Sequence, residues 1–184
     1  GRWRGTARRL PSTGASSRRA GEVGDLVDAL HRDERGVHVE RVYRERLRLT
    51  PGAQALLEGA KGAGLATLLV SGGFTFFTER LRERLGFTEA HANELVVEGG
   101  RLAGRVTGPL VDAAGKAAHV VRMRRSLGIG RERVLVIGDG ANDLAMMAEA
   151  GTSIAFRAKP VVRGHATYAL THAGLDGVLA LFPP

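Results

Sequence analysis

Two hydrophobic patterns alternate along the chain from about Val42 to its end. Short apolar runs at 65–70, 134–138 and 152–156 are typical of buried parallel strands, and a brief strand is expected at 168–170. Between these runs, apolar residues recur three and four positions apart, as in amphipathic helices. Strands and helices that alternate with short links predict an α/β fold: a Rossmann-like parallel sheet with helices on both faces and right-handed crossovers.

Local residues indicate where the elements begin and end. Thr50 and Pro51 suit the N-cap and first position of a helix that Gly62 or Gly64 ends. After the strand at 65–70 we expect a glycine loop, then a helix with its apolar face at Phe77, Leu81 and Leu85. The segment 94–106 predicts a hairpin that turns at Gly99–Gly100. Further helices are expected at 116–127, at 142–150, from 160, and near 175–181.

The first 40 residues show neither pattern. Residues 1–20 hold six arginines and no acidic residue, and so supply most of the net charge of +8. We therefore expect residues 1–40 to be an irregular Arg-rich segment, either disordered or frameshifted, and residues 41–184 to form the core domain. Nucleic-acid binding through this segment is the least favoured alternative, because the charge is not spread over folded elements.

Composition excludes several classes of protein. No apolar run is long enough to cross a bilayer, so no membrane partner is expected. With no cysteine, the chain cannot form disulfides, thiolate metal sites or a cysteine nucleophile, and a cytoplasmic location is expected. None of the six histidines has the spacing of a metal site, so surface or packing roles are expected for them.

Three groups of polar residues lie where ligands bind in open α/β sheets, beyond the carboxyl ends of strands. Ser71 and the N–H groups of the glycines after it could cradle an oxyanion, although a plain turn would look the same. Asp139 and Asp143 follow the strand at 134–138, and two carboxylates suit a hard cation such as Mg²⁺. Lys116 is the only lysine between positions 62 and 158, and could hold a phosphate or simply face solvent. Asn142 could cap the helix that follows.

These motifs together resemble the haloacid dehalogenase superfamily, and more narrowly the bacterial phosphoserine phosphatases, over residues from about 40 to 182. The matching segments are LLVSGGFTFF, ANEL, DAAGKA, IGDGANDLAMM and AFRAKP. The resemblance implies Mg²⁺-dependent hydrolysis of O-phosphoserine to serine and phosphate, the last step of serine synthesis.

The resemblance also implies a role for each matching residue. Ser71 and the Gly72 N–H would bind phosphoryl oxygens, and Lys116 would neutralise their charge. Asp139 would hold Mg²⁺ with Asp143 beside it in the metal site, and Asn142 would help to position the phosphate.

One motif of that superfamily has no counterpart here. Its nucleophile and acid/base pair belong to a DxDx(T/S) motif after the first strand, and this sequence contains no Asp-x-Asp. We therefore expect the first central strand and most of the helical cap to be missing, and activity to be impaired. The alternatives are an inactive phosphate- or metal-binding module, or a phosphatase for another small phosphomonoester.

Overall fold

A computed structural model describes residues 39–98 and 101–182, with side chains described at 42–96 and 105–182. The helices and 3₁₀ segments are α2 (Val39–Glu45), α3 (Ala53–Gly62), α4 (Thr75–Leu85), α5 (Ala113–Ser126), η1 (Arg131–Arg133), η2 (Ala141–Asp143), α6 (Leu144–Met147), α7 (Pro160–Arg163) and η3 (Leu175–Leu181). The strands are β1 (Leu68–Phe74), β2 (Glu89–Glu98), β3 (Arg101–Thr107), β4 (Leu135–Gly138), β5 (Thr152–Phe156) and β6 (Tyr168–Leu170).

Within these residues the strands form two three-stranded sheets, in the orders β1-β2-β3 and β4-β5-β6. Parallel pairing joins β1 to β2, β4 to β5 and β5 to β6, whereas β2 and β3 form the antiparallel hairpin that the sequence predicts. The strands β1 and β4 each end a sheet, and no ladder between them is seen in the described part. The expectation that the first central strand is missing stays a prediction, because residues 1–38 lie outside the described part.

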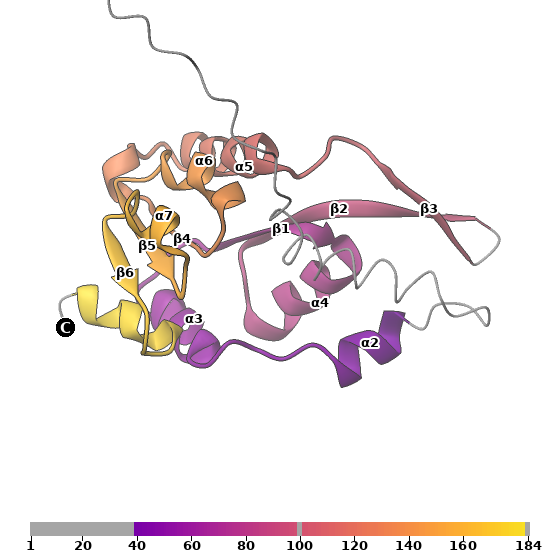
Figure 1. Ribbon diagram of the computed structural model, residues 1–184, viewed down its shortest axis with the longest axis horizontal. Coiled ribbons are helices and arrows are strands. Elements are labelled where there is room, and N and C mark those ends of the chain that lie inside the picture. The colour runs from indigo at the N-terminus through magenta and orange to yellow at the C-terminus, as the bar shows by residue number, and fades with distance from the viewer. Residues whose placement is uncertain (1–38, 99–100, 183–184) are drawn as a thin grey trace, which may run out of the picture.

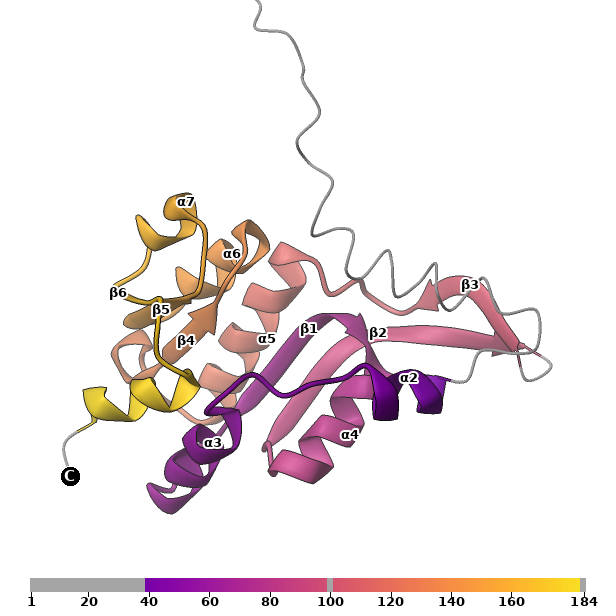
Figure 2. The same cartoon turned by 60° about the horizontal axis from the view of Figure 1, so that its bottom comes forward.

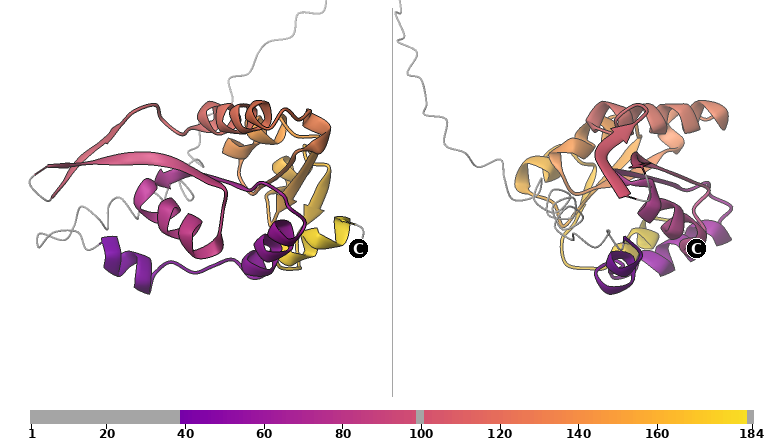
Figure 3. Two further views of the ribbon diagram at one scale, coloured as in Figure 1. Left: turned by 180° about the vertical axis from the view of Figure 1, so that it is seen from behind. Right: turned by 90° about the vertical axis from the view of Figure 1, so that its right-hand side faces the viewer.

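Helices cover both faces of the strands, as predicted. In Figure 1, α5 and α6 lie on one side of β1 and β4, and α3 and α4 lie on the other. Figure 2 shows α2 beside α4 and the β2–β3 hairpin reaching away from the second sheet. The two further views in Figure 3 show the same layers.

Two apolar clusters hold these layers together. The larger one joins α5, α6 and α7 to β4 and β5 through the buried residues Val120, Val136, Met146, Met147, Ala155, Ala158 and Val162. The smaller one centres on Phe74 and Phe77, with Val42, Tyr43 and Leu47 packed against it. Burial of these side chains is the main favourable term that keeps the helices on the strands. Among the described residues, no helix is long and apolar enough to cross a membrane.

Two local predictions are wrong. The helix expected from Pro51 begins at Ala53, because Gly52 has φ of 80° and cannot continue a right-handed helix. The glycine loop expected at 71–73 is the end of β1, which continues to Phe74. The pairing of β1 with β2 shifts register here, since Val70 faces His91 and Phe74 faces Asn93. The glycines thus form a bulged strand end instead of a loop.

Candidate phosphate-binding site

A buried ion pair joins two of the predicted site residues. The Lys116 ammonium, in the first turns of α5, donates to Asp143 Oδ1 at 2.8 Å. Only 7% of Lys116 and 4% of Asp143 is exposed, so the two charges are almost fully removed from water. A lysine in a solvated helix position would not be buried in this way, so the solvated alternative is wrong. The role of Lys116 in phosphate binding stays a prediction.

The other oxygen of Asp143 organises the turn after β4. Asp143 Oδ2 accepts hydrogen bonds from the N–H groups of Asp139 at 3.0 Å and Gly140 at 3.1 Å. Gly138 allows this approach, because a Cβ there would lie 2.6 Å from Cβ of Asp143. Burial raises the pKa of Asp143, but the hydrogen bonds from Lys116 and from the two N–H groups outweigh burial and hold that pKa below its usual value. The carboxylate therefore remains charged opposite Lys116.

Two predicted residues lie on the outer side of this turn. Asp139 follows directly after β4 and is exposed, and Asn142 is exposed in η2. Both oxygens of Asp143 already accept hydrogen bonds, so Asp139 is the carboxylate at this turn that faces outward. Within the described ranges, no group of three or more His, Cys, Asp or Glu residues could hold a metal ion. The roles of Asp139 and Asp143 as metal ligands stay predictions.

Ser71 and Gly72 lie in the bulged end of β1. The Ser71 hydroxyl oxygen accepts a hydrogen bond from the Gly73 N–H at 3.0 Å, so the serine side chain folds back over its own strand. Its hydroxyl hydrogen remains able to donate to a ligand. All three residues are partly exposed, which leaves this stretch accessible.

One side chain connects this bulge to the start of α5. Asn93 Nδ2 donates to the Gly72 carbonyl oxygen at 2.8 Å, and Asn93 Oδ1 accepts from the Val111 N–H at 2.8 Å. Val111 precedes Asp112, the N-cap of the helix that carries Lys116. Hydrogen bonds and short chain segments thus link Ser71–Gly72 to Lys116, and Lys116 to the turn at Asp139. The sequence brought Asn93 to notice only as part of ANEL, without a role.

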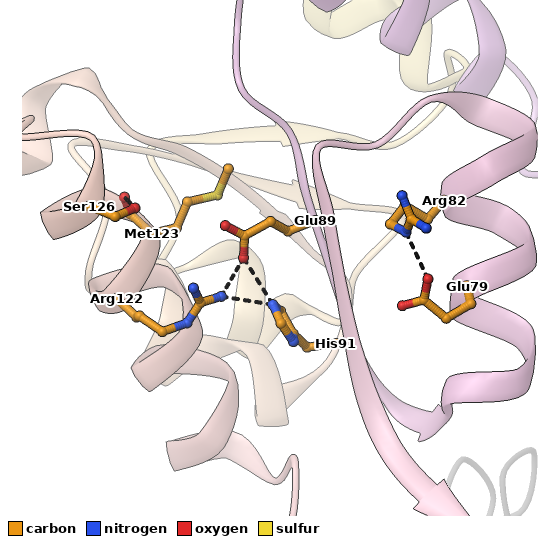
Figure 4. Close-up of polar contacts among 7 residues, drawn as sticks. All are labelled: Glu79, Arg82, Glu89, His91, Arg122, Met123 and Ser126. Carbon is orange, nitrogen blue, oxygen red and sulfur yellow. Dashed lines mark hydrogen bonds and ion pairs between the residues drawn. The ribbon is translucent and has the colours of Figure 1, made fainter.

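A second polar cluster, also missed from sequence, holds β2 against α5 (Figure 4). Glu89 on β2 forms an ion pair with Arg122 on α5, and His91 Nε2 lies 3.0 Å from the Glu89 carboxylate. The rings of His91 and His119 stack with centroids 4.1 Å apart. No spacing along the chain could reveal this cluster, because its residues come from two elements that pair only in the fold.

Comparison with known proteins places this architecture in a family. The family of haloacid dehalogenase-like hydrolases matches residues 7–148, which is most of the chain. The chain belongs to the haloacid dehalogenase-like hydrolases. The match begins inside the segment 1–40, and residues 1–38 lie outside the described part, so the expected division at residue 40 stays a prediction.

Within the haloacid dehalogenase-like hydrolases, many of the similar proteins are phosphoserine phosphatases. The chain is 44% identical over 171 residues to the phosphoserine phosphatase of Polaromonas sp. (strain JS666), an alignment that covers 88% of this chain and 72% of the relative. It is 49% identical over 138 residues to that of Streptomyces coelicolor, covering 75% and 34%. A crystal structure of phosphoserine phosphatase in apo form superposes with a TM-score of 0.74 at 33% identity, covering 79% of this chain and 72% of that one.

These alignments confirm the resemblance and the fold class. The chain nevertheless spans less than two thirds of the length of several curated phosphoserine phosphatases that it matches. Phosphatase activity of this chain is therefore proposed below together with the experiment that tests it.

Proposed function

We propose that this chain carries the phosphate-binding part of a phosphomonoester hydrolase of the phosphoserine phosphatase type. The reaction is hydrolysis of O-phosphoserine to serine and phosphate, as the last step of serine synthesis in the cytoplasm. The observation that carries the proposal is the connected set of contacts from the Ser71–Gly72 bulge through Asn93 to the helix of Lys116, and from Lys116 through Asp143 to the Asp139 turn.

The chemistry of these groups suits a phosphoryl group. Phosphoryl transfer is catalysed largely by positioning and by stabilisation of charge. In the proposal, the Ser71 hydroxyl and the Gly72 N–H donate to phosphoryl oxygens, and the Lys116 ammonium offsets their negative charge. Asn142, which is exposed beside Asp139, helps to position the same group.

We propose that Asp139 holds Mg²⁺. An exposed carboxylate at the carboxyl end of a strand fits this ion, which is bound in proteins by one or two carboxylates together with water and substrate phosphate. When bound, Mg²⁺ would offset part of the charge on the phosphate. Asp143 supports the site indirectly, because its carboxylate holds the Lys116 ammonium and the N–H groups of Asp139 and Gly140 in place.

The nucleophile is not assigned, because the sequence contains no Asp-x-Asp pair. We therefore expect phosphate binding by this chain, with little or no turnover. The test measures release of phosphate from O-phosphoserine with and without Mg²⁺, and binding of inorganic phosphate by calorimetry. Turnover that needs Mg²⁺ and is abolished by Asp139→Asn would show an active enzyme, whereas binding without turnover would identify a phosphate-binding module.

A panel of other phosphomonoesters decides the substrate. We expect O-phosphoserine to bind more tightly than glycerol phosphate or phosphothreonine, because the chain is similar to phosphoserine phosphatases. Equal affinity for all three would favour another small phosphomonoester. Failure to bind any phosphate, with or without Mg²⁺, would reject the proposal.

A further inference from the structure

Between Val70 and Phe74, β1 lacks the regular backbone pairing with β2 that the rest of the strand has. Between Val70 and Phe74 the strand β1 advances four residues, while β2 advances only two, from His91 to Asn93. Extra residues in a bulge drop out of the ladder, and their backbone groups need other partners. Ser71 and Gly72 lie in this stretch, so the bulge determines where their donor groups point.

Asn93 supplies one of those partners from the far side of the bulge. Its Nδ2 donates to the Gly72 carbonyl at 2.8 Å, at the point where β2 regains its register with β1. This bond fixes the orientation of the peptide that follows Gly72. Rotation of that peptide would also shift the Gly73 N–H, which donates to Ser71 Oγ at 3.0 Å.

The other end of the same amide holds the entrance to α5. Asn93 Oδ1 accepts from the N–H of Val111, a residue that is only 6% exposed. Asp112 follows as the N-cap, its side chain accepts from the Gly115 N–H at 2.8 Å, and Lys116 follows in the next position. The Asn93 side chain therefore fixes the spacing between the bulge and the helix of Lys116.

We infer that Asn93 is a positioning residue of the phosphate site, an inference that rests on the proposed function. It does not touch phosphate, but it fixes the donors of Ser71–Gly72 relative to the Lys116 ammonium. The amide offers a donor and an acceptor on one planar group, whereas alanine and leucine side chains offer neither and cannot replace it. A purely structural role would make Asn93 matter for stability alone, and the two roles differ in what they predict for binding.

The first experiment titrates the full chain with inorganic phosphate in the presence of Mg²⁺ by calorimetry. Asn93→Ala should weaken phosphate binding about 10-fold, which is the size of effect expected from the loss of about one hydrogen bond. The matched control is Thr88→Ala. It removes the hydrogen bond that Thr88 Oγ1 accepts from the Thr67 N–H at 3.0 Å, and these two residues directly precede β2 and β1. Thr88→Ala should lower stability and leave phosphate affinity unchanged.

A double-mutant cycle with Ser71→Ala shows whether Asn93 acts through the bulge. If it does, Asn93→Ala should weaken binding less than about threefold once Ser71 is already alanine. An effect of Asn93 on binding that does not pass through Ser71 would give the same fold loss in both backgrounds. The backbone amide signals of Gly72 and Gly73 in ¹H–¹⁵N spectra provide a direct readout. Phosphate should shift them at the same concentrations in the wild type and in Thr88→Ala, and Asn93→Ala should need about 10-fold more phosphate for the same shift.

Each outcome decides one of the two ideas. Binding by the wild type that Asn93→Ala leaves unchanged, or losses that simply add in the cycle, would overturn the role of Asn93 while the proposed function stands. No phosphate binding by the folded wild type, with no shift of the Gly72 signal, would reject the proposed function and this inference together.

Discussion

At the scale of single residues, the buried ion pair between Lys116 and Asp143 is costly for stability, and we relate it to phosphate binding. Both side chains are almost fully buried, and removing two charges from water costs several kcal/mol per ion before their attraction is counted. In proteins, replacement of a buried ion pair by apolar residues of similar volume is often neutral or stabilising. We interpret the pair as a device that presents an ammonium of fixed position near the Ser71–Gly72 bulge and the Asp139 turn.

Breaking this pair from the acidic side should be costly. Asp143→Asn removes the charge opposite Lys116 and weakens the acceptor for the Asp139 and Gly140 N–H groups. We expect the free energy of unfolding in urea to fall by about 3 kcal/mol or more. Lys116→Met should cost less, because Asp143 then keeps both N–H donors.

The matched control for this prediction is Asp139→Asn, which changes an exposed carboxylate in the same turn. It should change the free energy of unfolding by less than about 1 kcal/mol. Equal losses for the two Asp→Asn variants would contradict the interpretation that burial and pairing make Asp143 special.

At the scale of elements, the contact between β2 and α5 depends on protonation. The groups that meet there are Glu89 and His91 from β2, and His119 and Arg122 from α5. Burial lowers the pKa of His119, and the nearby charges of His91 and Arg122 lower it further. Its Nδ1 is buried without a hydrogen-bond partner. Hydrogen bonds from Arg122 and His91 hold the pKa of Glu89 below its usual value.

Acid should therefore loosen α5 from β2. Below the ordinary histidine pKa of about 6.5, the unfolded chain takes up a proton at His119 that the folded chain resists, so stability falls as pH falls. Below the ordinary pKa of Glu89 the same sign applies, because the unfolded carboxylate binds the proton first. Urea unfolding from pH 7.5 to 5 should show this loss, and His119→Leu should flatten the profile.

An exposed histidine provides the control for this pH profile. His172→Gln should leave the slope of stability against pH unchanged, because that side chain lies in solvent. A slope in His119→Leu that matches the wild type would show that the loss arises elsewhere in the chain.

Prediction from sequence succeeded for elements with a regular period and failed where the backbone departs from one. The strands at 152–156 and 168–170 were predicted with their observed bounds, because apolar runs fix them. The end of β1 was read as a loop, because glycines suit both loops and bulges and only the partner strand decides between them. The chemistry of three motifs predicts the candidate site residues, and the roles of these residues stay predictions. The contacts of Asn93 and the stack of His91 on His119 were not predicted, because they form only once the fold brings β2 to β1 and to side chains of α5.

At the scale of the whole molecule, the two sheets share a weakness. Among the residues that the structure describes, β1 and β4 each end a sheet, and in β1 every residue before Phe74 is only partly buried. An edge strand with unpaired backbone groups invites pairing with another chain. The apolar clusters that hold the layers together centre on different sheets. Within the described ranges, neither β1 nor β4 pairs with a strand of the other sheet.

We therefore expect the isolated 184-residue chain to be poorly stable and to associate. Thermal unfolding should be broad or begin below the range of about 45–65 °C that is usual for single domains. Sedimentation should show oligomers that grow with protein concentration, because strand edges pair between chains. Phosphate with Mg²⁺ should raise the midpoint in the wild type and not in Ser71→Ala, since a ligand that binds only the folded state stabilises it. A monomer at every concentration with one cooperative transition above about 65 °C would contradict this view, and would mean that packing of the helices alone closes the molecule.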